Sequence, residues 1–265
     1  MSDSTRISPT AHYTAYVWHK NGLSHPALVT PLGRKLYRAL RPANALLEKL
    51  GRPSLDGMLL ARHRFIDRAI DAAIDRGEVG QVIEIAAGFS PRGFQLMRRH
   101  RDLRYLETDL APQAEAKRRI LDEAGLRTPG HEVIALDALR DAGPGSLDDV
   151  AARHLDRAVG TVIITEGLLN YFDGETVHGM WRRIARCLAR FPSSLYLSDL
   201  NLASDVDGMV TARAFRHLLS AFARGRVHFH HDDPPSVMAA LRQAGFTRAE
   251  VHAAHPLVRV IEASV

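Results

Sequence analysis

The stretch from Val79 to Asp109 constrains the fold of this 265-residue chain more than any other part of the sequence. It opens with an apolar run, Val82–Ala86, which predicts a buried strand, and Gly88 then permits a sharp turn. A helical segment follows, and a second short strand, Leu103–Leu106, leads to Asp109. Strand, glycine turn, helix, strand and acid is the plan of a nucleotide-type cofactor site in a parallel α/β sheet.

Strand and helix signals alternate from this stretch to the end of the chain. The predicted strands are Val82–Ala86, Leu103–Leu106, Glu132–Leu136, Thr161–Thr165, Ser194–Ser198, Phe246–Val251 and Val258–Glu262. The predicted helices are Asp56–Arg76, Pro91–Arg99 (capped by Ser90), Gln113–Glu123, Leu147–His154, Thr176–Arg190, Thr211–Phe222 and Ser236–Ala244. This alternation predicts a doubly wound, mostly parallel α/β sheet, and the short link between the last two strands predicts an antiparallel hairpin at one edge.

The first part of the chain has no strand signal. Apolar residues at helical spacing predict one helix over Pro31–Leu40 and, after Pro42, a second over Ala43–Leu50. The aromatic segment from Tyr13 to Trp18 predicts a lid over an apolar acceptor. We therefore expect a helical N-terminal cap over residues 1–55 and a cofactor-binding domain over residues 56–265.

Composition argues against several classes of protein. The formal net charge is +5, but arginines are interleaved with acids, and no basic block with aromatics indicates a nucleic-acid surface. No apolar run approaches the ~20 residues that span a bilayer, and the N-terminus lacks the pattern of a secretory signal. The single cysteine, Cys187, excludes an internal disulfide, is typical of a cytoplasmic protein and lies on an apolar helix face, which predicts a core position.

The glycine turn distinguishes three kinds of nucleotide-type cofactor. A dinucleotide fingerprint requires G-x-G-x-x-G, and Ala86 stands where its first glycine belongs. A phosphate-binding P-loop needs a lysine after its second glycine, but Phe94 follows Gly93. S-adenosylmethionine has no phosphate, so Gly88 alone can admit it, and Asp109 can bind its ribose. These residues together favour S-adenosylmethionine.

Three segments resemble the leucine carboxyl methyltransferase-like family, which includes bacterial S-adenosylmethionine-dependent O-methyltransferases of natural-product pathways. The segments read VIEIAAGFSPRGF, YLETDLAPQAEAKRRIL and TVIITEGLLNYF, and a helix with Arg62 and Asp67 precedes them. Two positions depart from the family: Ser90-Pro91 replaces its usual Asp-Thr, and Pro112 lies one residue late. The resemblance implies a class I methyltransferase (Rossmann-like) fold with a seven-stranded sheet.

The resemblance also implies cofactor-binding residues, which are Arg62, Glu84, Gly88, Asp109, Leu110, Asp137, Ala138 and Glu166. Arg62 would pair with the carboxylate of the cofactor, because a planar guanidinium grips a carboxylate bidentately. Asp109 would bind the ribose hydroxyls, and Asp137 with Ala138 would meet the adenine edge. Glu166 would lie near the amino group of the cofactor.

The acceptor stays open between a carboxylate and a hydroxyl of a small molecule. A carboxylate is ionised at neutral pH and needs no base, whereas a phenol or alcohol would be helped by one. The candidates for that base are His12, His19, His25 and Asp199. We expect Tyr171 at the pocket wall beside the transferred methyl group, and His19 as the second catalytic residue.

Two other functions compete with O-methyl transfer. The altered Ser90-Pro91 is compatible with a protein that binds the cofactor without catalysis, whereas the missing glycines argue against a nicotinamide-dependent reductase. His228, His230 and Asp232 invite a metal site, but no second group of ligands lies at diagnostic spacing. We expect a polar loop there, no metal, and a small molecule rather than nucleic acid or membrane as partner.

Overall fold

The computed structural model describes residues 8–207 and 227–265. The predicted helix Thr211–Phe222 lies outside these described residues. Within the two ranges, no helix is long and apolar enough to cross a membrane.

A seven-stranded sheet with the order β3-β2-β1-β4-β5-β7-β6 forms the centre of the described fold. Its strands are β1 (Gln81–Ile85), β2 (Arg104–Asp109), β3 (His131–Ala135), β4 (Thr161–Thr165), β5 (Ser194–Leu200), β6 (Arg248–His255) and β7 (Val258–Ser264). β1 to β5 are parallel, whereas β7 pairs antiparallel with both β5 and β6. The predicted parallel sheet with an antiparallel hairpin at one edge is therefore confirmed.

β2 runs further than the sequence predicted. The predicted strand ended at Leu106, but β2 continues to Asp109, because it pairs with β1 as far as Thr108 and with β3 as far as Asp109. Thr108 lies opposite Ile85 of β1, and Asp109 lies opposite Ala135 of β3. This longer pairing fixes Asp109 at the carboxyl edge of the sheet, rather than in a loop.

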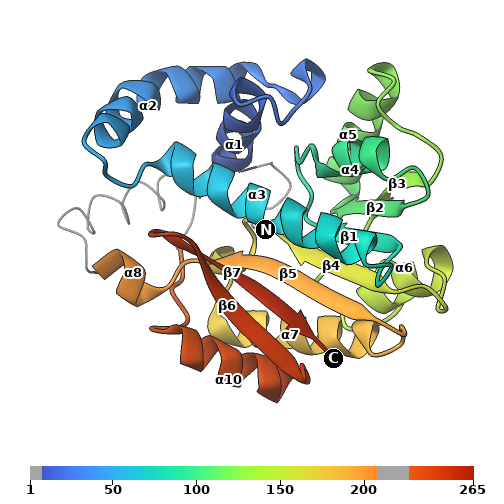
Figure 1. Ribbon diagram of the computed structural model, residues 1–265. Coiled ribbons are helices and arrows are strands. Elements are labelled where there is room, and N and C mark those ends of the chain that lie inside the picture. The colour runs from blue at the N-terminus through green and yellow to red at the C-terminus, as the bar shows by residue number, and fades with distance from the viewer. Residues whose placement is uncertain (1–7, 208–226) are drawn as a thin grey trace.

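Helices cover both faces of the sheet (Figure 1). Their bounds, with two short 3₁₀ turns, are α1 (Pro9–Lys20), η1 (Pro26–Leu28), α2 (Pro31–Lys49), α3 (Leu55–Asp75), α4 (Arg92–Arg99), α5 (Ala111–Glu123), α6 (Leu147–His154), η2 (Leu169–Tyr171), α7 (Gly174–Leu188), α8 (Ala203–Asp207) and α10 (Pro234–Ala244). α7 and α10 lie together on one side of the sheet in Figure 1. The side chains of α3 and α4 pack in the core cluster of the other face.

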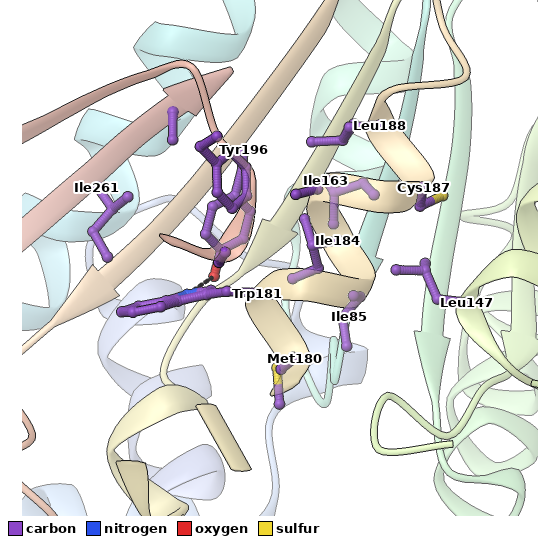
Figure 2. Close-up of a cluster of buried hydrophobic side chains, with 14 of the residues drawn as sticks. Ile85, Leu147, Ile163, Met180, Trp181, Ile184, Cys187, Leu188, Tyr196 and Ile261 are labelled. Carbon is purple, nitrogen blue, oxygen red and sulfur yellow. Dashed lines mark hydrogen bonds between the residues drawn. The ribbon is translucent and has the colours of Figure 1, made fainter. Parts of the chain in front are cut away.

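The alternation of side chains along β1 explains how the two faces are filled. Ile83 and Ile85 join the cluster that α6, α7 and α10 cover, whereas Val82 joins the cluster beneath α3 and α4. Figure 2 shows the first cluster, in which Trp181 Nε1 donates a hydrogen bond to the hydroxyl of Tyr196 (3.2 Å). Cys187 is fully buried there, which confirms its predicted core position.

The N-terminal helices differ from the prediction in one respect. α2 is a single helix with Pro42 inside it, where the sequence predicted two helices. The part of α2 after Pro42 stays helical because the side-chain amide of Asn44 donates to Tyr13 (2.9 Å) and Asp56 (3.2 Å). These buried bonds offset the backbone bond that proline cannot donate. The division into a cap over residues 1–55 and a domain over residues 56–265 stays a prediction.

The turn after β1 depends on two residues in the left-handed region. Gly88 has φ +46°, and Ala86 has φ 55° although it carries a side chain. The turn is closed by Ala87 N–H, which donates to Thr108 of β2 (2.9 Å), and by Ser90 N–H, which donates to Ala87 (2.7 Å). The helix after it begins at Arg92, one residue later than the predicted start at Pro91, which is the N-cap. The hydroxyl of Ser90 accepts a hydrogen bond from Arg92 N–H (3.3 Å), so Ser90 does contribute to the start of this helix.

Replacing Ala86 by glycine should stabilise the protein by up to about 1 kcal/mol, because alanine is strained at positive φ and glycine is not. Replacing the neighbouring Ala87, which lies outside the left-handed region, should instead cost about 0.5–1 kcal/mol. Urea unfolding of both variants measures the difference. A loss of stability in Ala86→Gly equal to that in Ala87→Gly would contradict the strain at this turn.

Candidate functional site

A cavity of about 680 Å³ lies at the carboxyl ends of β1 to β4, where parallel α/β sheets bind their ligands. The strand ends contribute the turns after β1 and β3, the end of β2 and the loop after β4. α1 covers the cavity from the N-terminal part of the chain, with Thr10, Ala11, Thr14 and Trp18 among its lining residues. The predicted lid segment therefore does border the cavity.

Eight of the ten predicted site residues line this cavity, namely Arg62, Gly88, Asp109, Leu110, Asp137, Ala138, Glu166 and Tyr171. They come from separate parts of the chain and are brought together only by the sheet. Glu84 and His19 do not line it.

Glu84 lies in the middle of β1, and its side chain is turned into the protein. Its carboxylate accepts hydrogen bonds from Arg92 (2.5 Å) and from the hydroxyl of Tyr105 (2.8 Å), and the residue is 1% exposed. Glu84 is therefore engaged beneath the glycine turn, away from the cavity. In the structure, Glu84 forms an ion pair with Arg92.

None of the three histidines considered as a base lies at the cavity wall. His19 Nδ1 is 3.4 Å from the carbonyl of Ser24, and His12 Nδ1 is 2.9 Å from the hydroxyl of Thr30. His25 accepts a hydrogen bond from the N–H of Ala27 and so caps η1. The Nδ1 atom of each is used within the N-terminal helices and turns.

Asp109 is oriented by two backbone groups. Gly88 N–H donates to one carboxylate oxygen (2.9 Å), and Leu110 N–H donates to the other (2.8 Å). Each carboxylate oxygen can accept a second hydrogen bond, and Asp109 lines the cavity, so the residue suits a diol that donates two hydrogen bonds. Burial raises the pKa of Asp109, while the two backbone N–H groups oppose that rise.

Arg62 of α3 reaches the cavity between two carboxylates. Its Nε donates to Glu166 (3.1 Å) and its Nη1 to Asp199 (2.7 Å), while Asp199 also accepts from the N–H of Gly167 (2.5 Å). A Cβ at Gly167 would lie 3.0 Å from Arg62 Nη2, and φ there is +67°. Glycine is thus required at this position both by the backbone and by the guanidinium. Asp199, the fourth candidate base, is buried and serves to hold Arg62.

Arg92 is the centre of the buried ion network. It is 0% exposed and pairs with Asp67 (2.6 Å), Glu84 and Glu166. The Nδ1 atom of His63 lies 2.8 Å from Arg92 Nη2 and 2.9 Å from Glu166 Oε2. The network joins α3, β1, α4 and the loop after β4, so it sets the position of Glu166 at the cavity wall.

Glu166 is ionised within this network. Burial would raise its pKa, but the interactions with His63, Arg92 and Arg62 outweigh burial and hold the pKa of Glu166 well below its usual value. A permanent carboxylate at the cavity wall suits a cationic group of a ligand.

A second, small cavity of about 50 Å³ adjoins the first. Four residues line both cavities, namely Thr10, Arg62, Gly167 and Tyr171. Its remaining wall includes the apolar side chains of Leu55, Met58 and Leu59. Tyr171 therefore stands at the junction of a large, partly polar cavity and a small one with apolar walls.

The histidine-rich segment, residues 228–231, packs across the loop that carries Tyr171. His228 N–H donates to Asn170 (2.8 Å), and His230 Nε2 lies 2.5 Å from the carbonyl oxygen of Phe172. No cluster of three or more potential metal ligands occurs among residues 8–207 and 227–265. The segment thus holds the loop around η2 by one backbone N–H and one imidazole side chain.

Sequence reasoning missed the roles of His63 and Trp18. The ring of Trp18 lies 4.5 Å from that of His63, so α1 packs directly against the ion network. Two adjacent basic residues, Arg62 and His63, in the helix before β1 could have indicated a shared site. Trp18 had been assigned only to a lid over an apolar acceptor.

The sequence profile of the leucine carboxyl methyltransferase family matches residues 25–185 of the chain. A relative described as leucine carboxyl methyltransferase 1, from Eremothecium gossypii, is 27% identical over 127 residues, which cover 41% of this chain. The match spans only 38% of that relative's length.

Solved structures share the fold. A putative methyltransferase from Thermobifida fusca aligns with a TM-score of 0.66 and 14% identity, over 99% of this chain and 96% of that one. The S-adenosylmethionine-dependent methyltransferase SibL aligns with a TM-score of 0.57 and 19% identity, over 89% of this chain and 59% of that one. The predicted class I methyltransferase fold is confirmed by these alignments and the sheet order.

Replacing Arg92 by methionine should cost about 3–5 kcal/mol of unfolding free energy, because it leaves buried carboxylates without their cation. Arg99→Met is the matched control, since Arg99 pairs with Asp71 at the surface, where a pair contributes about 1 kcal/mol or less. Urea unfolding measures both. Equal losses in the two variants would contradict the central place of Arg92.

The stabilisation from Glu166 should depend on pH. Since its pKa is lower when folded than when unfolded, its contribution is complete above its usual pKa of about 4.5 and declines as the pH falls below that value. The difference in unfolding free energy between wild type and Glu166→Gln should therefore shrink from pH 6 to about pH 3. A difference that is constant across this range would show that Glu166 is not an ionised member of the network.

Proposed function

Because this chain belongs to the leucine carboxyl methyltransferase family, we propose that it transfers a methyl group from S-adenosylmethionine to an oxygen of a small molecule. One observation supports this most: predicted cofactor-binding residues from four strand ends and α3 line one cavity. The similar protein SibL is described as S-adenosylmethionine-dependent.

The residues at the cavity match the parts of this cofactor. The carboxylate of Asp109 suits the ribose diol, the turn around Gly88 gives room near the end of β1, and Glu166 suits a cationic amine. Arg62 supplies a guanidinium edge for a carboxylate. When bound, the cofactor would supply an electrophilic sulfonium methyl group. The chain's contribution to transfer is then alignment and exclusion of water, which α1 provides by covering the cavity.

A carboxylate acceptor is favoured over a hydroxyl. No histidine or lysine is found among the described residues that line either cavity. The acids are Asp109, Asp137 and Glu166 in the large cavity and Asp199, which is paired with Arg62, in the small one. A carboxylate needs no base at neutral pH, so this wall is sufficient for it. The junction at Tyr171 is the place where acceptor and cofactor would meet.

Transfer of a labelled methyl group tests the proposal. The protein is incubated with S-adenosylmethionine labelled on its methyl group and a panel of small carboxylic acids and phenols. Label that alkali releases as volatile methanol indicates a carboxyl ester, whereas stable label indicates an ether. Failure to bind S-adenosylmethionine and S-adenosylhomocysteine would overturn the proposal, and binding without transfer would support a non-catalytic binding protein.

Asp109→Ala should weaken binding of S-adenosylhomocysteine by about 1–3 kcal/mol, the range for lost hydrogen bonds to a charged group. Asp102→Ala, in the exposed turn before β2, is the control and should leave affinity unchanged. Isothermal titration calorimetry measures both. Unchanged affinity in Asp109→Ala would show that the ribose binds elsewhere.

A further inference from the structure

The small cavity has the size of one end of a ligand rather than of a whole ligand. Its volume is about 50 Å³. One water molecule needs about 10–15 Å³ of such space, so the cavity has room for about three or four non-hydrogen atoms. It lies directly beside the large cavity, because Thr10, Arg62, Gly167 and Tyr171 line both.

One face of α3 forms the apolar wall of the small cavity. The lining residues Leu55, Met58, Leu59 and Arg62 follow each other at three- or four-residue spacing, which places them on the same side of a helix. Arg62 also lines the large cavity, whereas the three apolar residues line only the small one. The stripe therefore leads from the wall that both cavities share into apolar surroundings.

Four polar side chains of the same wall bind one another or the backbone. Asn170 and Asn201 each donate an amide hydrogen to a backbone carbonyl oxygen (2.6 and 2.5 Å). Arg62 is the one cation among the described residues that line the small cavity, and it is paired there with Asp199 (2.7 Å). A carboxylate in this cavity would thus meet another carboxylate and a guanidinium that is already paired. An apolar group is favoured inside it, and a charged group is favoured outside it.

Met58 contacts the opposite wall of the small cavity. Its Sδ atom lies 3.8 Å from Nδ2 of Asn201, which follows β5, and the residue is 2% exposed. Methionine is long, unbranched and uncharged, so truncation to alanine removes the Cγ, Sδ and Cε atoms from the wall and leaves the ion pairs in place. Val227 also lines this cavity and is half-buried, so a larger side chain there would reduce the space.

We propose that the small cavity binds the apolar end of a short-chain carboxylic acid, the methyl acceptor, and that Met58 sets the longest chain that fits. The carboxylate of this acid lies outside the small cavity, at the junction marked by Tyr171. This assignment rests on the proposed function, since it takes the acid as the acceptor. The volume of the cavity corresponds to about three or four carbon atoms beyond the carboxyl group, as in butyric and valeric acid.

The transfer itself needs no further reactant. One carboxylate oxygen of the acid forms the new bond to the methyl carbon, and the bond from that carbon to sulfur breaks with its electron pair left on sulfur. No proton moves, because the acid is ionised at neutral pH. The products are a methyl ester and S-adenosylhomocysteine.

A series of straight-chain acids, from acetic to decanoic acid, tests the assignment. The full chain is incubated with S-adenosylmethionine labelled on its methyl group, and the label that alkali releases as methanol gives kcat/KM for each acid. Met58→Ala enlarges the cavity and Val227→Phe reduces it. Met97→Ala is the matched control, since Met97 is a buried methionine of the cluster beneath α3 and α4 and lines neither cavity.

For the wild type we expect kcat/KM to rise about fourfold with each added carbon, the effect of one buried methylene group, as far as butyric or valeric acid. It should fall for longer acids. Met58→Ala should move the optimum by about two or three carbons toward longer acids, because about three non-hydrogen atoms of space are gained. Val227→Phe should move it toward shorter acids, and Met97→Ala should leave it unchanged.

An optimum that is the same in Met58→Ala and in the wild type would overturn the assignment and leave the proposed function intact. Transfer to phenols but to none of the acids would do the same. If the chain methylates no compound, the proposed function fails. Calorimetry of the acids with the chain loaded with S-adenosylhomocysteine then decides the assignment by the same dependence on chain length, and failure of every acid to bind overturns it. If Met58→Ala does not fold, Val227→Phe decides by its opposite shift.

Discussion

The buried guanidinium of Arg92 is the interaction on which the site depends. Burial opposes its charge, but Glu166, Glu84 and Asp67 surround it and raise its pKa well above the usual value. These partners come from α3, β1 and the loop after β4, so they meet only when helices and sheet have assembled. Since Arg92, Glu84 and Glu166 would each be a buried charge without a partner, the network is stable only as a whole. Glu166 and, through it, Arg62 acquire fixed positions as a result.

A second ion cluster fastens the glycine turn from the other side. Lys117 of α5 pairs with Glu107 of β2 and donates to the carbonyl of Ser90 (2.9 Å). Gly93 is needed for this arrangement, because a Cβ there would lie 2.2 Å from Glu107 Oε1. The spacing of Gly88 and Gly93, which imitates a phosphate-binding loop, is therefore explained by helix packing against a buried acid.

The sequence predicted those features that follow from local pattern. Alternating apolar runs predicted the order of strands and helices, and the position after each strand predicted Asp109, Asp137 and Glu166 at one edge. The pattern could not show where side chains pair across the fold. Glu84 lies on β1 as predicted, yet it is directed to Arg92, which lies in another element. Likewise, a proline usually ends a helix, but the tertiary bonds of Asn44 keep α2 continuous.

The base candidates illustrate the same limit. Histidine is a common catalytic base, so residue type alone proposed His12, His19 and His25. None of the three lines the cavity, and the Nδ1 atom of each contacts a neighbouring group of the N-terminal segment. Conversely, Trp18 was seen only as an apolar side chain. The structure shows that its Nε1 atom is buried and has no hydrogen-bond partner within the described residues, which no sequence pattern could indicate.

The chain contains two tryptophans, and the structure assigns them opposite surroundings. Trp181 is enclosed in the core between α7 and the sheet, with its Nε1 bonded to Tyr196, whereas Trp18 lines the cavity. The protein therefore carries a built-in optical reporter and its own internal reference. A change in the emission of Trp18 against the steady signal of Trp181 would report the filling of the cavity without any label, even for ligands that are never turned over.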